Sequence, residues 1–169
     1  MSEHDLFNIA SYLPSRASET PDRQAIIFPG RYGSDGKRIY SRMTFGQLEK
    51  LSNRFANALT AYGIGCGTKT LLFVTPSPEF IALTFGLFKA GAVPILIDPG
   101  MGIARLSECV RNLKPDAFIG VPKSHLLRIV KRGAFSSVRH TITVGRKWLP
   151  WGGLTLDALL ERFGRGLAS

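Results

Sequence analysis

The segment 88–100, FKAGAVPILIDPG, constrains the fold of this chain more than any other. It begins as a helix end, and Gly91 stops that helix because glycine readily takes the left-handed conformation found there. Residues 93–97 are apolar, which is typical of a strand buried on both faces. Asp98 stands where that strand ends. A strand of this kind needs other strands beside it and helices above and below it.

Similar strand and helix patterns alternate from residue 70 onward. We predict strands at 70–75, 93–97, 117–120 and 141–144, and helices at 77–90, 103–113 and 124–131. A last helix is predicted at 154–163. This alternation implies right-handed crossovers and a parallel sheet with helices on both faces.

The first part of the chain follows a different pattern. A helix is predicted to start near Asp5, with Pro14 either kinking it or marking a later start. Strands at 24–28 and 38–43 flank the glycine-rich turn 29–36, which predicts an antiparallel hairpin. The predicted fold class is therefore α/β, a parallel sheet with helices on both faces, preceded by a small antiparallel hairpin.

The helix after the hairpin carries a complete start signal. Thr44 and Gln47 have the spacing of a capping box, in which each side chain bonds to the backbone N–H of the other. The apolar stripe that follows ends at Gly63, which predicts the helix stop.

Length and composition limit the class of protein. The 169 residues, 44% of them hydrophobic, are enough for one domain with a buried core. No apolar run reaches the ~20 residues that a membrane span needs. Glu3, His4 and Asp5 stand where a secretory leader would carry positive charge. We therefore predict a cytoplasmic protein.

The net charge of +10 is concentrated in the second half of the chain. Between residues 100 and 150 the acids are Glu108 and Asp116, whereas the basic residues are Arg105, Arg111, Lys114, Lys123, Arg128, Lys131, Arg132, Arg139, Arg146 and Lys147. Such a region could meet nucleic acid, an anionic membrane surface or an acidic protein. It could equally be a solvated helix face, or a surface covered by another part of the protein.

The cysteines and histidines form no recognisable site. Cys66 and Cys109 lack metal-ligand spacing and are predicted to be free, buried thiols. His4, His125 and His140 have neither a metal partner at helical spacing nor a nearby nucleophile. We predict surface or capping roles for them. Nucleic-acid binding is disfavoured because the aromatic residues are not interleaved with arginine; for Trp148 and Trp151, which come nearest to that pattern, we predict packing at the domain edge.

Two glycine clusters and one carboxylate are candidates for ligand contact. The cluster 63–67 follows a helix and opens a strand, the reverse of the order in a dinucleotide loop. Gly100 and Gly102 have the right order, but Arg105 takes the place of the third glycine. Asp98 marks the strand edge where open α/β sheets place their sites, or it caps a turn. These residues alone predict an α/β domain without a complete active site.

Four motifs, taken together, resemble a known family. They are MTFGQL at 43–48, Leu59 with the glycine turn at 63–67, PSPEF at 76–80, and the segment 88–99. Their order and spacing are similar to the front of the adenylate-forming enzymes, which include acyl-CoA synthetases, luciferases and peptide-synthetase adenylation domains. The resemblance covers about residues 6–144. One departure is GTKT at 67–70, where the family usually has Gly-Asp-x-Val.

The resemblance implies what the whole protein does. Residues 1–169 would be the N-terminal part of the acyl-adenylating large domain, with a core at about 6–144 and an edge segment at 145–169 that leads toward the remainder. ATP and Mg²⁺, and CoA in some members, would serve the parent enzyme. The family's phosphate loop and catalytic lysine lie further along than this chain reaches, so no catalytic, cofactor-binding or metal residue is assigned and the chain alone is expected to bind no cofactor and to be inactive.

Details at 76–80, 98–101, 118–122 and 151–153 look most like the fatty-acid-CoA-ligase-like branch, which includes the β-lactone synthetases of bacterial olefin biosynthesis. The implied substrate is a fatty acyl or 3-hydroxy acyl carboxylate. Self-association through exposed apolar surface and peripheral membrane contact are further expectations. The alternatives are a basic α/β module that docks an acidic partner or anionic membrane, and a small nucleotide-binding oxidoreductase.

Overall fold

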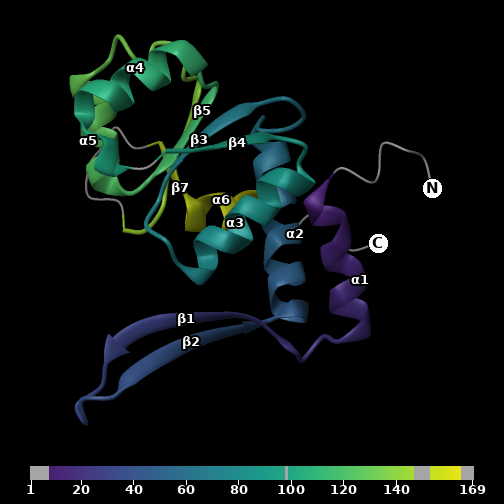
Figure 1. The fold of residues 1–169 in the computed structure, drawn as a ribbon. Coiled ribbons are helices and arrows are strands. Elements are labelled where there is room, and N and C mark those ends of the chain that lie inside the picture. The colour runs from purple at the N-terminus through teal and green to yellow at the C-terminus, as the bar shows by residue number, and fades with distance from the viewer. Residues whose placement is uncertain (1–7, 98, 147–152, 165–169) are drawn as a thin grey trace.

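A five-stranded parallel sheet forms the centre of the molecule in the computed structural model, which describes residues 8–97, 99–146 and 153–164 (Figure 1). The strand order is β4-β3-β5-β6-β7, and every neighbouring pair is parallel. The strands are β3 (Lys69–Phe73), β4 (Val93–Leu96), β5 (Ala117–Gly120), β6 (His140–Thr143) and β7 (Leu154–Thr155). The predicted parallel sheet is therefore confirmed.

Helices cover both faces of this sheet, as predicted. One face carries α2 (Phe45–Ala61), α3 (Pro78–Lys89) and α6 (Leu156–Phe163), with α1 (Tyr12–Glu19) packed on α2. The other face carries α4 (Ile103–Leu113) and α5 (Pro122–Val130). Successive strand residues supply the two cores, because side chains alternate across a strand: Leu72 faces the α2 side, and Leu71 faces α4.

The helix boundaries follow the signals in the sequence. Thr44 Oγ1 accepts from the Gln47 amide at 3.3 Å and Gln47 Oε1 accepts from the Thr44 amide at 3.0 Å, which confirms the capping box. Ser77 Oγ accepts from the Phe80 amide at 3.0 Å and begins α3. Gly63 and Gly91 follow α2 and α3 with φ of +94° and +72°, the left-handed region that glycine reaches without strain.

The N-terminal segment takes one of the two predicted helix starts and departs from the prediction in the hairpin. A 3₁₀ turn, η2 (Ile9–Ser11), precedes α1, so the helix has the later start and Pro14 lies in its first turn. The hairpin strands are β1 (Gln24–Tyr32) and β2 (Arg38–Thr44). The prediction of a turn at residues 29–32 is wrong, because these residues continue β1. Pro29 is tolerated there since both strands of a two-stranded ribbon are edge strands.

The strand predicted at 93–97 is present as β4, but its predicted burial on both faces is wrong. β4 is the edge strand of the sheet, and Val93 and Leu96 are 49% and 59% exposed. The Val93 amide donates to the Thr68 carbonyl at 2.9 Å, toward β3. Since successive residues of a strand point their amides to opposite sides, the nitrogen of Pro94 faces the open edge and offers no donor there.

The C-terminal part of the described chain adds to the same sheet. β7 pairs with β6, and Thr155 Oγ1 accepts from the Ala158 amide at 3.1 Å to begin α6. Leu156 and Leu159 of α6 are buried in the core with α2. In the described part of the chain, none of the helices combines the length and the apolarity that a membrane span requires.

Candidate functional site

An apolar cleft lies at the carboxyl edge of the sheet. Its volume is about 320 Å³, and its lining residues are Leu72, Phe73, Val74, Thr75, Pro76, Phe80, Leu96, Ile97 and Val121. They come from the ends of β3 and β4, the residue after β5, and the first turn of α3. Asp98, the candidate site residue at this edge, lies outside the described residues.

The topology explains why the cleft forms there. β3 leads through α3 to β4 on one side, whereas β5, on the other side of β3, leads through α5 to β6. The helices α3 and α5 therefore depart to opposite faces and leave a crevice between the ends of β3 and β5. Open α/β sheets bind ligands at such a switch point, outside the carboxyl ends of the strands.

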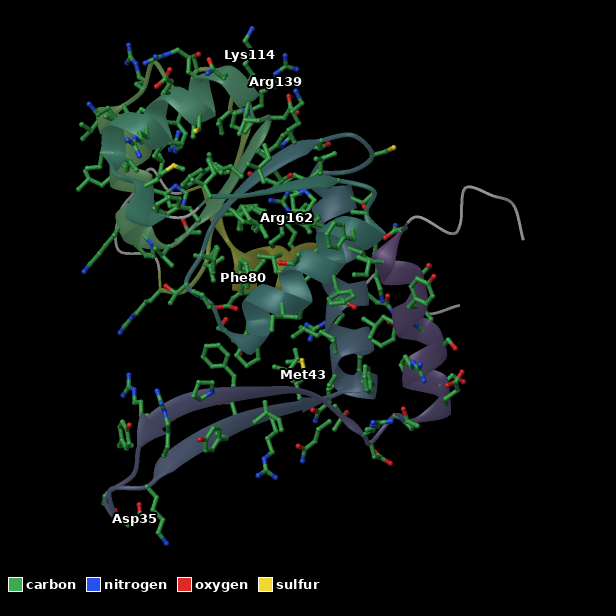
Figure 2. All side chains as sticks on the ribbon, in the orientation of Figure 1. Asp35, Met43, Phe80, Lys114, Arg139 and Arg162 are labelled. Carbon is green, nitrogen blue, oxygen red and sulfur yellow. The ribbon has the colours of Figure 1, made fainter. Side chains whose placement is uncertain are left out.

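The cleft offers apolar contact and little else. Among its described lining residues only Thr75 has a polar side chain, and none is ionisable. Phe80 of α3 lines the cleft, whereas Met43 faces up from β2, and the hairpin lies below the start of α3 (Figure 2). The lining can hold an aliphatic or aromatic group, but it supplies no acid, base or nucleophile.

A second, polar cleft of about 520 Å³ lies where α1, α2 and α3 meet. Lys89 Nζ lies 2.5 Å from Glu49 Oε2 and 2.7 Å from Asn53 Oδ1, with 12% and 19% of the Lys89 and Glu49 side chains exposed. Asn8 Nδ2 donates to the Phe88 carbonyl at 3.0 Å. Lys89 belongs to the motif at 88–99, but its partners Glu49 and Asn53 could not be predicted, because they lie on another helix and no local signal marks them.

The described histidines do not form a catalytic pair. His125 was predicted at the surface, and this is wrong: it is fully buried between α5 and β6. Its Nε2 lies 3.2 Å from both the Ile142 carbonyl and Thr143 Oγ1, so Nε2 carries the proton that the carbonyl accepts. His140, half-buried, lies edge-on to Tyr62 at 5.5 Å. His4, Trp148 and Trp151 lie outside the described residues.

The structure also places the two thiols and the glycine clusters. Both cysteines are free as predicted, but their predicted burial is wrong: Cys66 is exposed and Cys109 is half-buried. Cys66 is exposed because it lies in the turn between α2 and β3. The cluster 63–67 forms that helix stop and turn. Gly102 precedes α4 with φ +85° and no side-chain cap.

The charged side chains of the described residues offer no metal site. In residues 8–97, 99–146 and 153–164, no group of three or more His, Cys, Asp or Glu side chains could hold a metal ion. Burial lowers the pKa of the Arg128 guanidinium on α5, although an arginine remains charged at any physiological pH.

Comparison with known proteins relates this fold to enzymes. A family described as "AMP-binding enzyme" matches residues 13–158. The olefin beta-lactone synthetase of Stenotrophomonas maltophilia is 48% identical over 159 residues, which cover 93% of this chain and 28% of that protein. The long-chain-fatty-acid–CoA ligase FadD13 of Mycobacterium tuberculosis is 36% identical over 128 residues, which cover 75% of this chain and 24% of that protein.

Among solved structures, a fatty acyl CoA synthetase of Mycobacterium tuberculosis matches with a TM-score of 0.70 and 26% identity. The match covers 97% of this chain and 30% of that one. The chain thus spans less than a third of the length of each of these three proteins.

Proposed function

The chain belongs to the AMP-binding enzymes, and we propose that it is the N-terminal portion of an ATP-dependent acyl-activating ligase. In the whole protein, a carboxylate oxygen attacks the α-phosphorus of ATP, which gives an acyl-adenylate and releases pyrophosphate. A nucleophile then attacks the acyl carbon, and AMP leaves. That nucleophile is the thiol of CoA or, where the acid carries a 3-hydroxyl group, this internal hydroxyl, which closes a β-lactone.

The observation that carries the proposal is the identity of 48% across 93% of the chain with an olefin beta-lactone synthetase. It exceeds the 36% identity with the fatty-acid–CoA ligase and extends further along the chain. We therefore place a 3-hydroxy acyl carboxylate first as substrate and a simple fatty acyl carboxylate second. We also propose a cytoplasmic location, where the reducing environment keeps Cys66 and Cys109 as thiols.

This chain contributes the scaffold. Its described cleft residues do not fit ATP or Mg²⁺, because they present neither a cation for the triphosphate nor a carboxylate for the metal. The catalytic groups of the ligase would then lie in the rest of the protein. The sheet, the switch-point cleft and the hairpin would form one wall against which that remainder packs.

The test compares the 169-residue chain with the complete protein encoded by its gene. Each is assayed for ATP–pyrophosphate exchange with a long-chain fatty acid, with the matching 3-hydroxy acid and without acid. We expect exchange by the complete protein that depends on the acid, and none by the chain alone. Exchange catalysed by the chain alone, or no exchange by a folded complete protein with either acid, would refute the proposal.

Product analysis then separates the two acceptors. With the 3-hydroxy acid and ATP but no CoA, a β-lactone is the expected product. Formation of acyl-CoA alone, and only when CoA is added, would agree with the ligase assignment but would refute the ranking of the 3-hydroxy acid above the simple fatty acid.

A variant of the complete protein with Phe80→Ala in the cleft should weaken binding of the acid more than binding of ATP.

A further inference from the structure

The outer surface of α4, α5 and their flanking turns is strongly cationic. Its exposed basic residues are Arg105, Arg111, Lys114, Lys123, Lys131, Arg132 and Arg139. The acids of this region are Glu108 and Asp116. Figure 1 shows α4 and α5 at one end of the molecule and the β1–β2 hairpin at the other, and Figure 2 shows Lys114 and Arg139 at the α4 end.

Three cations gather in a hollow on this surface. The hollow has a volume of about 450 Å³ and is lined by Ala104, Ser107, Arg111, Val130, Lys131, Arg132, Gly133 and Ala134. None of these described lining residues is acidic. Arg111 comes from the last turn of α4, whereas Lys131 and Arg132 follow α5, so the packing of the two helices brings the three charges together. A group of this composition suits a phosphate.

Large aliphatic side chains adjoin the hollow. Leu126, Ile129 and Val130 of α5 are 49%, 36% and 68% exposed, and their spacing places them on one stripe of the helix. Val130 also lines the hollow, so the stripe and the cations are continuous. The opposite side of α5 is buried through Ser124 and His125. The core therefore contacts the other side of α5, and the aliphatic stripe faces outward.

We propose that this surface, the α4–α5 face of Arg111, Leu126, Val130, Lys131 and Arg132, docks on an anionic lipid membrane. The hollow would receive a lipid phosphate, and the aliphatic stripe would enter the headgroup–acyl boundary. Lipid binding of this type combines apolar burial with attraction to anionic headgroups, and the α4–α5 face offers both. It would hold the protein at the surface where long acyl chains reside.

The same observations disfavour other polyanions. Single-stranded nucleic acid needs exposed aromatic rings on which its bases stack, but Phe118 and Phe135 on this side of the sheet are buried. An acidic protein would complement the basic residues, but its binding would not explain why three aliphatic side chains are exposed beside them. The proposal is independent of whether the whole protein adenylates a carboxylate.

The test is co-sedimentation of the chain with vesicles of phosphatidylcholine, with or without phosphatidylglycerol. One variant removes two cations, Lys131→Ser with Arg132→Ser, and a second removes apolar contact, Leu126→Ser with Val130→Ser. The matched control, Lys37→Ser with Arg42→Ser, removes the same charge from the hairpin at the far end. Circular dichroism confirms that each variant is folded.

We expect the chain to bind only the anionic vesicles, and less as salt increases. The two-cation variant should bind about 30-fold more weakly, since each cation near an anionic leaflet contributes about fivefold. The apolar variant should bind at least about fourfold more weakly, since a single CH₂ group buried in the membrane already contributes about 0.8 kcal/mol. The hairpin control should bind like the unchanged chain.

Four results with the 169-residue chain would overturn the proposal. They are no binding to anionic vesicles, an equal loss in the hairpin control, binding to neutral vesicles alone, and normal binding by the apolar variant while polyglutamate or DNA competes for the face. The complete protein is tested in the same way. Its failure to bind vesicles would show that the remainder of the protein covers the α4–α5 face, and would refute membrane docking whatever its ligase activity.

Discussion

Replacing Gly86 with alanine tests how closely α2 and α3 pack against each other. An added Cβ at Gly86 would lie 2.6 Å from Phe55 Cβ, 3.2 Å from the Ser52 carbonyl oxygen and 3.3 Å from the Ala56 amide nitrogen. All three atoms belong to, or are fixed by, the backbone of α2. None can rotate away, so the two helices themselves would have to separate.

The cost can be estimated from two opposing effects. Carbon atoms pack best at about 3.5–4.0 Å, so the helices must part by roughly 1 Å at this crossing. Overpacking of a core costs about 1–3 kcal/mol, and a contact with backbone belongs at the upper end. Alanine gains about 1 kcal/mol over glycine in helix propensity. We therefore expect a net loss of about 2 kcal/mol in the free energy of unfolding.

Urea denaturation followed by circular dichroism measures this loss. With a slope of about 2 kcal/mol per molar urea, the midpoint should fall by about 1 M. The matched control is Gly133→Ala, because Gly133 is exposed and an added Cβ there meets no atom within 4 Å. A Gly86→Ala protein as stable as the control would refute the close helix crossing.

Two further substitutions test the polar cleft and the open edge of the sheet. Lys89→Met removes the partner of a largely buried Glu49 and should lower the free energy of unfolding by about 2–3 kcal/mol, most of which Glu49→Leu in the same chain should restore. Unchanged stability in the single variant would contradict the role of the pair. Pro94→Val supplies an amide donor at the open edge of β4, next to the exposed Val93 and Leu96, so sedimentation equilibrium should show more self-association. An unaltered monomer fraction would show that the proline does not protect this edge.

Local signals were enough to predict most elements. Thr44 with Gln47, Ser77, and the glycines after α2 and α3 mark helix ends by hydrogen bonds and backbone conformations formed within a few residues. Apolar runs and their spacing then predicted the parallel sheet and its two helical layers. The carboxyl edge of the sheet could likewise be predicted as the place for a site, because strand direction follows from the alternation of strands and helices.

Features that depend on strand order and long-range contact could not be predicted. β3 and β4 are both apolar, but β4 is exposed because β5 pairs with the other side of β3. The two-residue β7 is too short to show a period in the sequence. His125 is buried because β6 supplies a carbonyl for its ring, from a strand beyond the next turn.

The sequence by itself determined the kinds of element, their order and their family, since these follow from short-range hydrogen bonding, apolar periodicity and motif spacing. Only the tertiary structure decided which strand lies at the edge, that Lys89 binds Glu49, and that Arg111 meets Lys131 and Arg132 in one hollow. Those outcomes depend on how separate helices pack around the sheet, and the packing free energy that sets them is a property of the whole core rather than of any single segment.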